Sequence, residues 1–170
     1  QPVTLNDFRK ILIDQVPEIK NAWIEPKTDA VENEKGTYQV FLQLEEGLED
    51  QKWLLIEKKV WEKLNEFRNL GADFDSIEIL TYEDISFSAT IELSYNAMGE
   101  EVLGKILAAM EDYLSPHIRK FSLQELLEQG ERIEDILEGP MLHKGFIRDD
   151  DLLPRTRLIR TSKFTEIITS

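Results

Sequence analysis

Residues 85–93 carry the most regular hydrophobic pattern in the sequence, and this pattern limits the possible folds most. Apolar and polar side chains alternate without exception, with Ile85, Phe87, Ala89, Ile91 and Leu93 on one side and Ser86, Ser88, Thr90 and Glu92 on the other. A period of two residues predicts a β-strand with one buried and one solvated face, as in antiparallel sheets. Residues 82–84 are expected to form a tight turn, so we expect this strand to run antiparallel to a strand at Ser76–Leu80.

The neighbouring segments place this strand in a longer order of elements. Apolar residues spaced by three and four predict amphipathic helices at about 51–70 and 99–114, and alternation predicts a strand at 38–44. Strand, helix, strand, strand, helix is the split-βαβ, or ferredoxin-like, order without its last strand. We therefore expect an α+β fold with two helices on one face of a four-stranded antiparallel sheet. The last strand would lie at His117–Phe121 or beyond Ser170.

Capping signals predict further helices on both sides of this core. Thr4–Asp7 has the form of a capping box and begins a helix that ends at Pro17, and Ala22–Ile24 is a candidate short strand. Ser122–Glu125 is a second capping box, followed by short helical patterns. The expected divisions are a helix-and-strand lead at 1–36, the ferredoxin-like core at 37–120 and a helical appendage at 121–170 that continues beyond Ser170.

Charge is distributed unevenly along the chain. The net charge is −14, but residues 141–170 contain six basic and four acidic side chains. Within that segment Arg155, Arg157, Arg160 and Lys163 follow one another without an acidic residue between them. An acidic body repels phosphate backbones, so we expect no nucleic-acid partner. The basic segment could instead dock on an acidic neighbour, including another copy of the same chain.

Several kinds of chemistry have no signal in the sequence. There is no cysteine, no apolar run of the roughly 20 residues that span a bilayer and no secretion signal, so we expect neither disulfides nor membrane insertion. His117 and His143 lack the spacing of metal ligands, and Asp149–Asp151 lacks the alternation of a calcium loop. No glycine-rich phosphate loop is present. We therefore predict no catalytic, cofactor or metal site, and a binding or structural role.

One tryptophan is a candidate for a protein interface. Trp61 lies beside Val60, at the edge of the apolar stripe of the helix expected at 51–70. A tryptophan at this position either completes the core or stays exposed, and exposed tryptophans suit protein interfaces.

The opening and closing stretches of the chain resemble a known family. Val3–Phe8 and Val16–Ala22 look like the "VTxxDY…PGVxxA" opening of baseplate J-like modules, which occur in contractile phage tails and related injection systems. Gly145–Ile147 and Arg157–Ile168 resemble that family's later stretch, in which a small capped helix precedes a strand. Pro17–Ile19 departs from the pattern, since Glu-Ile replaces Gly-Val. The long segment 117–156 is more similar to injection-system relatives than to simple phage members.

The resemblance implies a structural baseplate component that works by assembly, with no enzymatic activity. Its implied partners are other baseplate subunits, including copies of itself and wedge or sheath-proximal proteins, in a particle assembled in the cytoplasm. The candidate interface residues are Trp61, Arg155, Arg157, Arg160, Lys163 and Phe164. On this reading the basic side chains of the final helix face an acidic surface of this chain or of a wedge neighbour.

Two other functions are open at this point. A small-molecule-binding regulatory domain can have the same ferredoxin-like shape and often dimerises through its sheet. A hydrolase with a pair of facing carboxylates would require those groups to meet in a cleft, which the sequence does not reveal.

Overall fold

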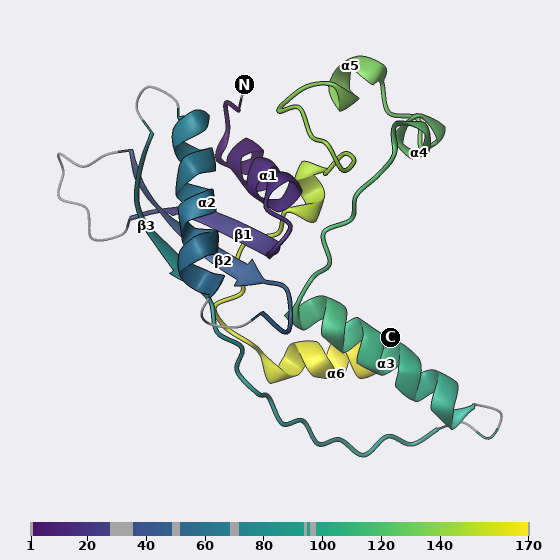
Figure 1. The fold of residues 1–170 in the computed structure, drawn as a ribbon. Helices are drawn as coiled ribbons and strands as arrows, with labels where there is room; N and C mark the ends of the chain where they lie inside the picture. The colour runs from purple at the N-terminus through teal and green to yellow at the C-terminus, as the bar shows by residue number, and fades with distance from the viewer. Residues whose placement is uncertain are drawn as a thin grey trace. The chain divides into compact units, whose positions relative to one another are not determined.

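The chain folds into two compact units, each built from two separate stretches of sequence. The computed structural model describes residues 2–27, 36–48, 52–68, 72–93, 95 and 98–169 (Figure 1). Unit 1 comprises Gln1–Thr81 and Ile118–Leu152, and unit 2 comprises Tyr82–His117 and Leu153–Ser170. No helix in the described ranges combines the length and the apolar character needed to cross a membrane.

Unit 1 begins with helix α1, Leu5–Gln15, and its start is fixed by a capping box. The Thr4 hydroxyl accepts a hydrogen bond from the Asp7 N–H, and the Asp7 carboxylate accepts one from the Thr4 N–H. Together they satisfy backbone donors that a helix N-terminus leaves unpaired. Phe8 and Leu12 on this helix are buried in the core. The expected N-terminal helix is therefore confirmed.

The sheet of unit 1 has three strands in the order β1-β2-β3, formed by Ile19–Pro26, Thr37–Leu44 and Asp73–Ile79. β1 and β2 are antiparallel, with a register shift between Ile19 and Asn21, and β2 and β3 are parallel. Parallel strands require a crossover connection. Helix α2, Trp53–Glu66, is that crossover, and it buries Ile56, Val60 and Leu64 (Figure 1).

The second stretch of unit 1 has little regular structure. It contains α4 at Leu123–Glu128, α5 at Ile133–Ile136 and the short 3-10 helix η3 at Asp149–Asp151. Phe121 and Phe146 form an isolated antiparallel bridge. Gly145 has φ +115° beside this bridge, and a Cβ there would lie 2.9 Å from the Phe121 carbonyl oxygen, so the close approach of the two backbones requires glycine. Ile147 and Leu152 join the main core.

Unit 2 is small and mostly helical. Helix α3, Gly99–Leu114, packs against helix α6, Thr161–Thr169. Their shared core consists of Ile106, Met110 and Phe164, and the Phe164 ring contacts the rings of Tyr113 and Phe87 with centroid distances of 5.6 and 5.2 Å. Residues 82–93 run extended and belong to no strand.

The α+β class and the helical C-terminal part are confirmed, whereas the expected sheet is wrong in two respects. Three strands pair in the described residues rather than four, and one pair is parallel, so the ferredoxin-like arrangement is not formed. The expected strand at 85–93 has strand-like composition but no paired neighbour, and Phe121 of the candidate last strand pairs only with Phe146. The two units also group the chain differently from the expected three parts, because α1 packs with the sheet.

Candidate functional site

The polar face of α1 holds the second stretch of unit 1, Ile118–Leu152 (the returning segment), in place. The buried Asp14 carboxylate accepts hydrogen bonds from the backbone N–H groups of His143 and Lys144, both at 2.7 Å. Arg9 donates to the carbonyl oxygens of Ala22 and Leu152, and Lys10 pairs with Asp149 at 3.2 Å. Three charged side chains of one helix therefore fix a stretch of chain more than 120 residues further along the sequence.

Burial lowers the pKa of one of these anchors. Desolvation lowers the pKa of Arg9 from its ordinary value to about 10, although the charges of Asp149 and Glu25 act in the opposite direction. A pKa of about 10 leaves the guanidinium charged at neutral pH, so Arg9 keeps its donors for the two carbonyl oxygens. This arrangement fits a structural anchor.

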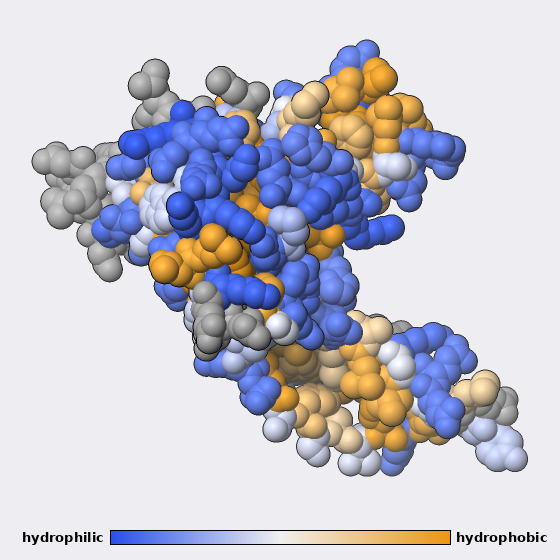
Figure 2. All heavy atoms as spheres, in the orientation of Figure 1, coloured by the Kyte–Doolittle hydropathy of each residue, from blue (hydrophilic) through white to orange (hydrophobic). Residues whose placement is uncertain are grey.

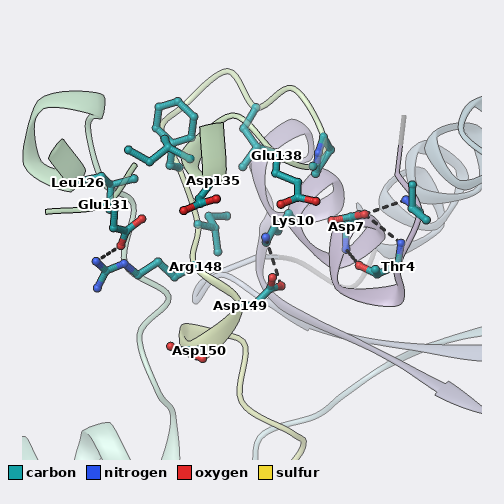
Figure 3. A pocket seen from close by; sticks show the side chains of 17 residues that line it. Thr4, Asp7, Lys10, Leu126, Glu131, Asp135, Glu138, Arg148, Asp149 and Asp150 are labelled. Atoms are coloured by element: carbon teal, nitrogen blue, oxygen red, sulfur yellow. Dashed lines mark hydrogen bonds and ion pairs between the residues drawn. The ribbon is translucent and has the colours of Figure 1, made fainter. Parts of the chain in front are cut away.

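A cavity of about 810 Å³ lies between α1 and the returning segment (Figure 3). Its wall combines apolar side chains such as Leu126 and Ile136 with charged ones. The acidic lining residues are Asp7, Glu131, Asp135, Glu138, Asp149 and Asp150, and the basic ones are Lys10 and Arg148.

Several of the cavity's carboxylates already have partners. Asp7 caps α1, Asp149 pairs with Lys10, and Glu131 pairs with Arg148. Figure 3 shows these pairs along the wall. Within the described ranges, no three His, Asp or Glu side chains gather as metal ligands would. Three of the six acidic side chains of the wall are thus engaged in structural ion pairs or in a helix cap.

Unit 2 exposes a broad apolar surface. On α3, Leu103 and Leu107 stand one turn apart beside the buried Ile106 and Met110, and both are more than half exposed. The extended segment adds Ile85, Phe87, Ile91 and Leu93, which are 37–50% exposed. Figure 2 shows apolar side chains gathered over the helices of this unit. Exposed apolar surface of this extent marks interaction sites in soluble proteins.

The structure brings together five of the six candidate interface residues. Arg155, Arg157, Arg160 and Lys163 lie in unit 2, and three of them are exposed while Arg155 is half-buried. Lys163 pairs with Glu166 at 2.9 Å. Phe164 is 6% exposed and belongs to the interior of unit 2 rather than to its surface. Trp61 lies in unit 1, where it packs against the core and stays partly exposed.

Sequence reasoning did not reveal the cavity or the anchors of α1. Their residues extend from Val3 to Asp150, so no local spacing connects them. One signal was available, because Asp7, Lys10 and Asp14 interrupt the apolar positions of α1 at intervals of three and four. Polar residues at helical spacing indicate a face that meets polar partners.

Comparisons with known proteins gave a match by sequence and a match by fold. Residues 81–163, just under half of the chain, match the family described as baseplate wedge Pvc12-like domain 3. A comparison with curated protein sequences gave no match.

The fold also matches a chain in the cryo-EM structure of the anti-feeding prophage (AFP) baseplate, 6-fold symmetrised. The TM-score is 0.61 at 20% sequence identity over 93% of this chain, which spans 28% of the matched chain. By sequence, residues 81–163 are thus similar to domain 3 of Pvc12-like baseplate wedge proteins, and the fold is similar to part of an AFP baseplate chain.

Proposed function

We propose that this chain is a structural component of the baseplate of a contractile, phage tail-like injection apparatus, and that it acts through protein–protein assembly. The observation that carries the proposal is the match of residues 81–163 to a baseplate wedge domain. The fold match to an AFP baseplate chain supports it, because it extends over 93% of the chain. The broad apolar surface of unit 2 fits a protein that is covered by neighbouring subunits.

The proposal also includes the family that the sequence suggests for this chain. The stretches Val3–Phe8 and Arg157–Ile168 support a relationship to baseplate J-like modules. The partners would be other baseplate subunits, among them further copies of this chain and wedge or sheath-proximal proteins, in a particle assembled in the cytoplasm. The chain would catalyse no reaction, insert into no membrane and bind no nucleic acid, in keeping with its net charge of −14.

The basic segment is the proposed electrostatic contact to such neighbours. Arg157 and Arg160 are exposed, as is Lys163, in a chain that is otherwise strongly acidic. Opposite charges across an interface raise the association rate and select the partner. Trp61 would contribute its exposed part in unit 1, and Phe164 would act indirectly by holding α6 on α3.

The test is co-expression of this chain, tagged, with the sheath, tube and wedge proteins of one injection apparatus. We expect purification to recover a stoichiometric complex that contains wedge subunits. The double variant Arg157→Glu/Arg160→Glu should weaken association at least about tenfold at low salt, with a smaller effect at high salt, where charges are screened. The control Lys58→Glu/Lys52→Glu makes the same charge change at exposed positions of unit 1 and should leave association intact. Recovery of the chain alone under all conditions would refute the proposal.

The small-molecule sensor alternative receives no support from the sheet. That alternative depended on a four-stranded antiparallel sheet, and the described strands form a three-stranded mixed one.

A further inference from the structure

Residues 83–93 have the sequence of a strand and run extended, but they pair with no strand in the part of the chain that the structure describes (Figure 1). Every residue from 83 to 93 is exposed, on the apolar and on the polar side of the alternation. None of their backbone groups hydrogen-bonds to another described residue of unit 2. An unpaired extended backbone is a template for pairing with another chain.

The apolar side of this stretch is already partly held by its own unit. The ring of Phe87 contacts the ring of Phe164, with centroids 5.2 Å apart, and Leu93 Cδ1 lies 3.4 Å from the position that a Cβ of Gly99 would occupy. Nevertheless Ile85 is 50% exposed, Phe87 45%, and Leu93 45%. A second strand beside this one would cover part of that apolar area and satisfy the backbone at the same time.

Charge restricts the partner. The stretch carries Glu83, Asp84 and Glu92 and no basic residue. In the fullest antiparallel pairing of two identical copies, residue 84 of each copy lies opposite residue 92 of the other, which places Asp84 against Glu92 twice. Parallel pairing in register stacks each acid on its own counterpart. Like charges directly opposite one another destabilise a strand pair.

We propose that residues 83–93 accept an added β-strand from a different polypeptide, one whose residues alternate between apolar side chains and Lys or Arg. Main-chain hydrogen bonds would supply the pairing, and the basic residues would face Asp84 and Glu92 on the solvated side. This inference deepens the proposed function by naming one assembly surface, and it rests on that function only for where such a strand would come from.

Binding can be measured with the intact chain and synthetic probes. The probe is a capped nine-residue peptide that alternates Val and Lys. The first control replaces each Lys by Glu, and the second carries N-methyl groups on all of its backbone nitrogens, which removes the hydrogen-bond donors of both edges without changing charge. We expect the Lys peptide to bind at least about tenfold more tightly than either control and to protect alternate amides within 83–93 from hydrogen exchange.

Substitutions in the chain test the pairing independently. Neighbouring N–H groups of a strand point to opposite edges, so Ser88→Pro and Ala89→Pro each remove a donor from one edge. At least one of them should weaken binding about tenfold or more, whereas Ser88→Ala, which keeps the N–H group, should not. Circular dichroism and amide exchange in α3 check that unit 2 stays folded in each variant.

Four results would overturn the inference: amides of 83–93 already protected in the isolated monomer, equal binding of the Lys and Glu peptides, no effect of either proline, or a dimer in sedimentation that the proline variants abolish. The last result would assign the stretch to a second copy of this chain. Because the peptide experiment involves no baseplate protein, its failure leaves the co-purification result untouched, and the reverse also holds.

Discussion

At the scale of single residues, Asp14 connects α1 to backbone groups that lie 129 and 130 residues further along the chain. It is 1% exposed, and each of its carboxylate oxygens accepts one backbone N–H. A buried charge is tolerated only when it is hydrogen-bonded, and bonds to charged acceptors are stronger than neutral ones. The conformation at His143 and Lys144 therefore depends on this one side chain.

Asp14→Asn is expected to lower the free energy of unfolding by about 2 kcal/mol, because an amide offers one acceptor where the carboxylate offers two and directs its NH₂ group at a backbone donor. Urea denaturation followed by tryptophan fluorescence measures the change. The matched control is Asp112→Asn on the exposed side of α3, which should change stability by less than about 0.5 kcal/mol. Equal effects of the two substitutions would contradict the anchoring role of Asp14.

Glu18 provides a prediction about pH. A hydrogen bond from the Lys59 ammonium lowers the pKa of the Glu18 carboxyl below its ordinary value of 4.5. A group whose pKa is lower in the folded state stabilises the fold above its unfolded pKa, and this contribution is lost as pH falls through the folded pKa. Glu18→Gln should therefore cost stability at pH 7 and flatten the decline on the acid side below about pH 4.5.

Chemical denaturation at a series of pH values between neutral and acid tests this expectation. Glu46→Gln, at an exposed position, removes the same charge and serves as the control. The interpretation fails if both variants follow the pH dependence of the unmodified protein.

At the scale of elements, α6 depends on one aromatic side chain. Phe164 is the buried residue that α6 contributes to the core of unit 2, and it faces Ile106 and Met110 on α3. A nine-residue helix is not stable alone in water, so its packing face must hold it. Loss of this ring would release both α6 and the apolar inner face of α3.

Phe164→Ala is expected to destabilise unit 2 by about 3 kcal/mol through lost burial and the cavity left behind. Hydrogen exchange should then show loss of protection in α3 and α6, with β1 and β2 unchanged. Leu158→Ala truncates an apolar side chain that is 66% exposed and should have little effect. Unchanged protection in α6 of the Phe164→Ala variant would refute the dependence.

Elements with a local signal were predictable from the sequence, and pairings were not. The helix expected at 99–114 agrees with α3, and the helix at 51–70 contains α2, because spacing by three and four reports a buried stripe directly. Alternation at 85–93 reports only that a strand could form there. Whether a partner lies beside it depends on residues far away in sequence or on another chain, so the sheet was predicted with the wrong number of strands.

The same distinction applies to the candidate site, where local sequence patterns could be predicted and arrangements created by the fold could not. The basic run from Arg155 to Lys163 is visible in any listing of charges, and its exposed members lie on unit 2. The cavity between α1 and the returning segment could not be predicted, because residues as far apart in the sequence as Asp7 and Asp150 line it together only through the fold.

At the scale of the whole molecule, the two units differ in how much apolar surface they bury. The core of unit 1 draws on α1, α2 and three strands, whereas the described core of unit 2 contains three buried residues. Stability differs between regions of a protein according to such contacts. Unit 2 should therefore open more easily than unit 1.

Native-state hydrogen exchange measures this difference residue by residue. Amides of α3 are expected to exchange through openings of lower free energy than amides of α1 and β2. Added baseplate partners should raise the protection of α3 toward that of unit 1, since ligands that bind the folded state stabilise it. A single opening free energy for all three elements would contradict the expectation.

The bonds from Asp14 to His143 and Lys144 join positions 129 and 130 residues apart. A ribosome makes α1 long before it makes the backbone donors that Asp14 needs, and pairings over such separations form slowly. Until those donors are made, the Asp14 carboxylate lacks both of these hydrogen bonds. The other stretch of unit 1, Ile118–Leu152, follows α3 in the sequence and is therefore translated after it. Unit 1 can thus be completed only after translation has passed α3 and reached residues 143 and 144.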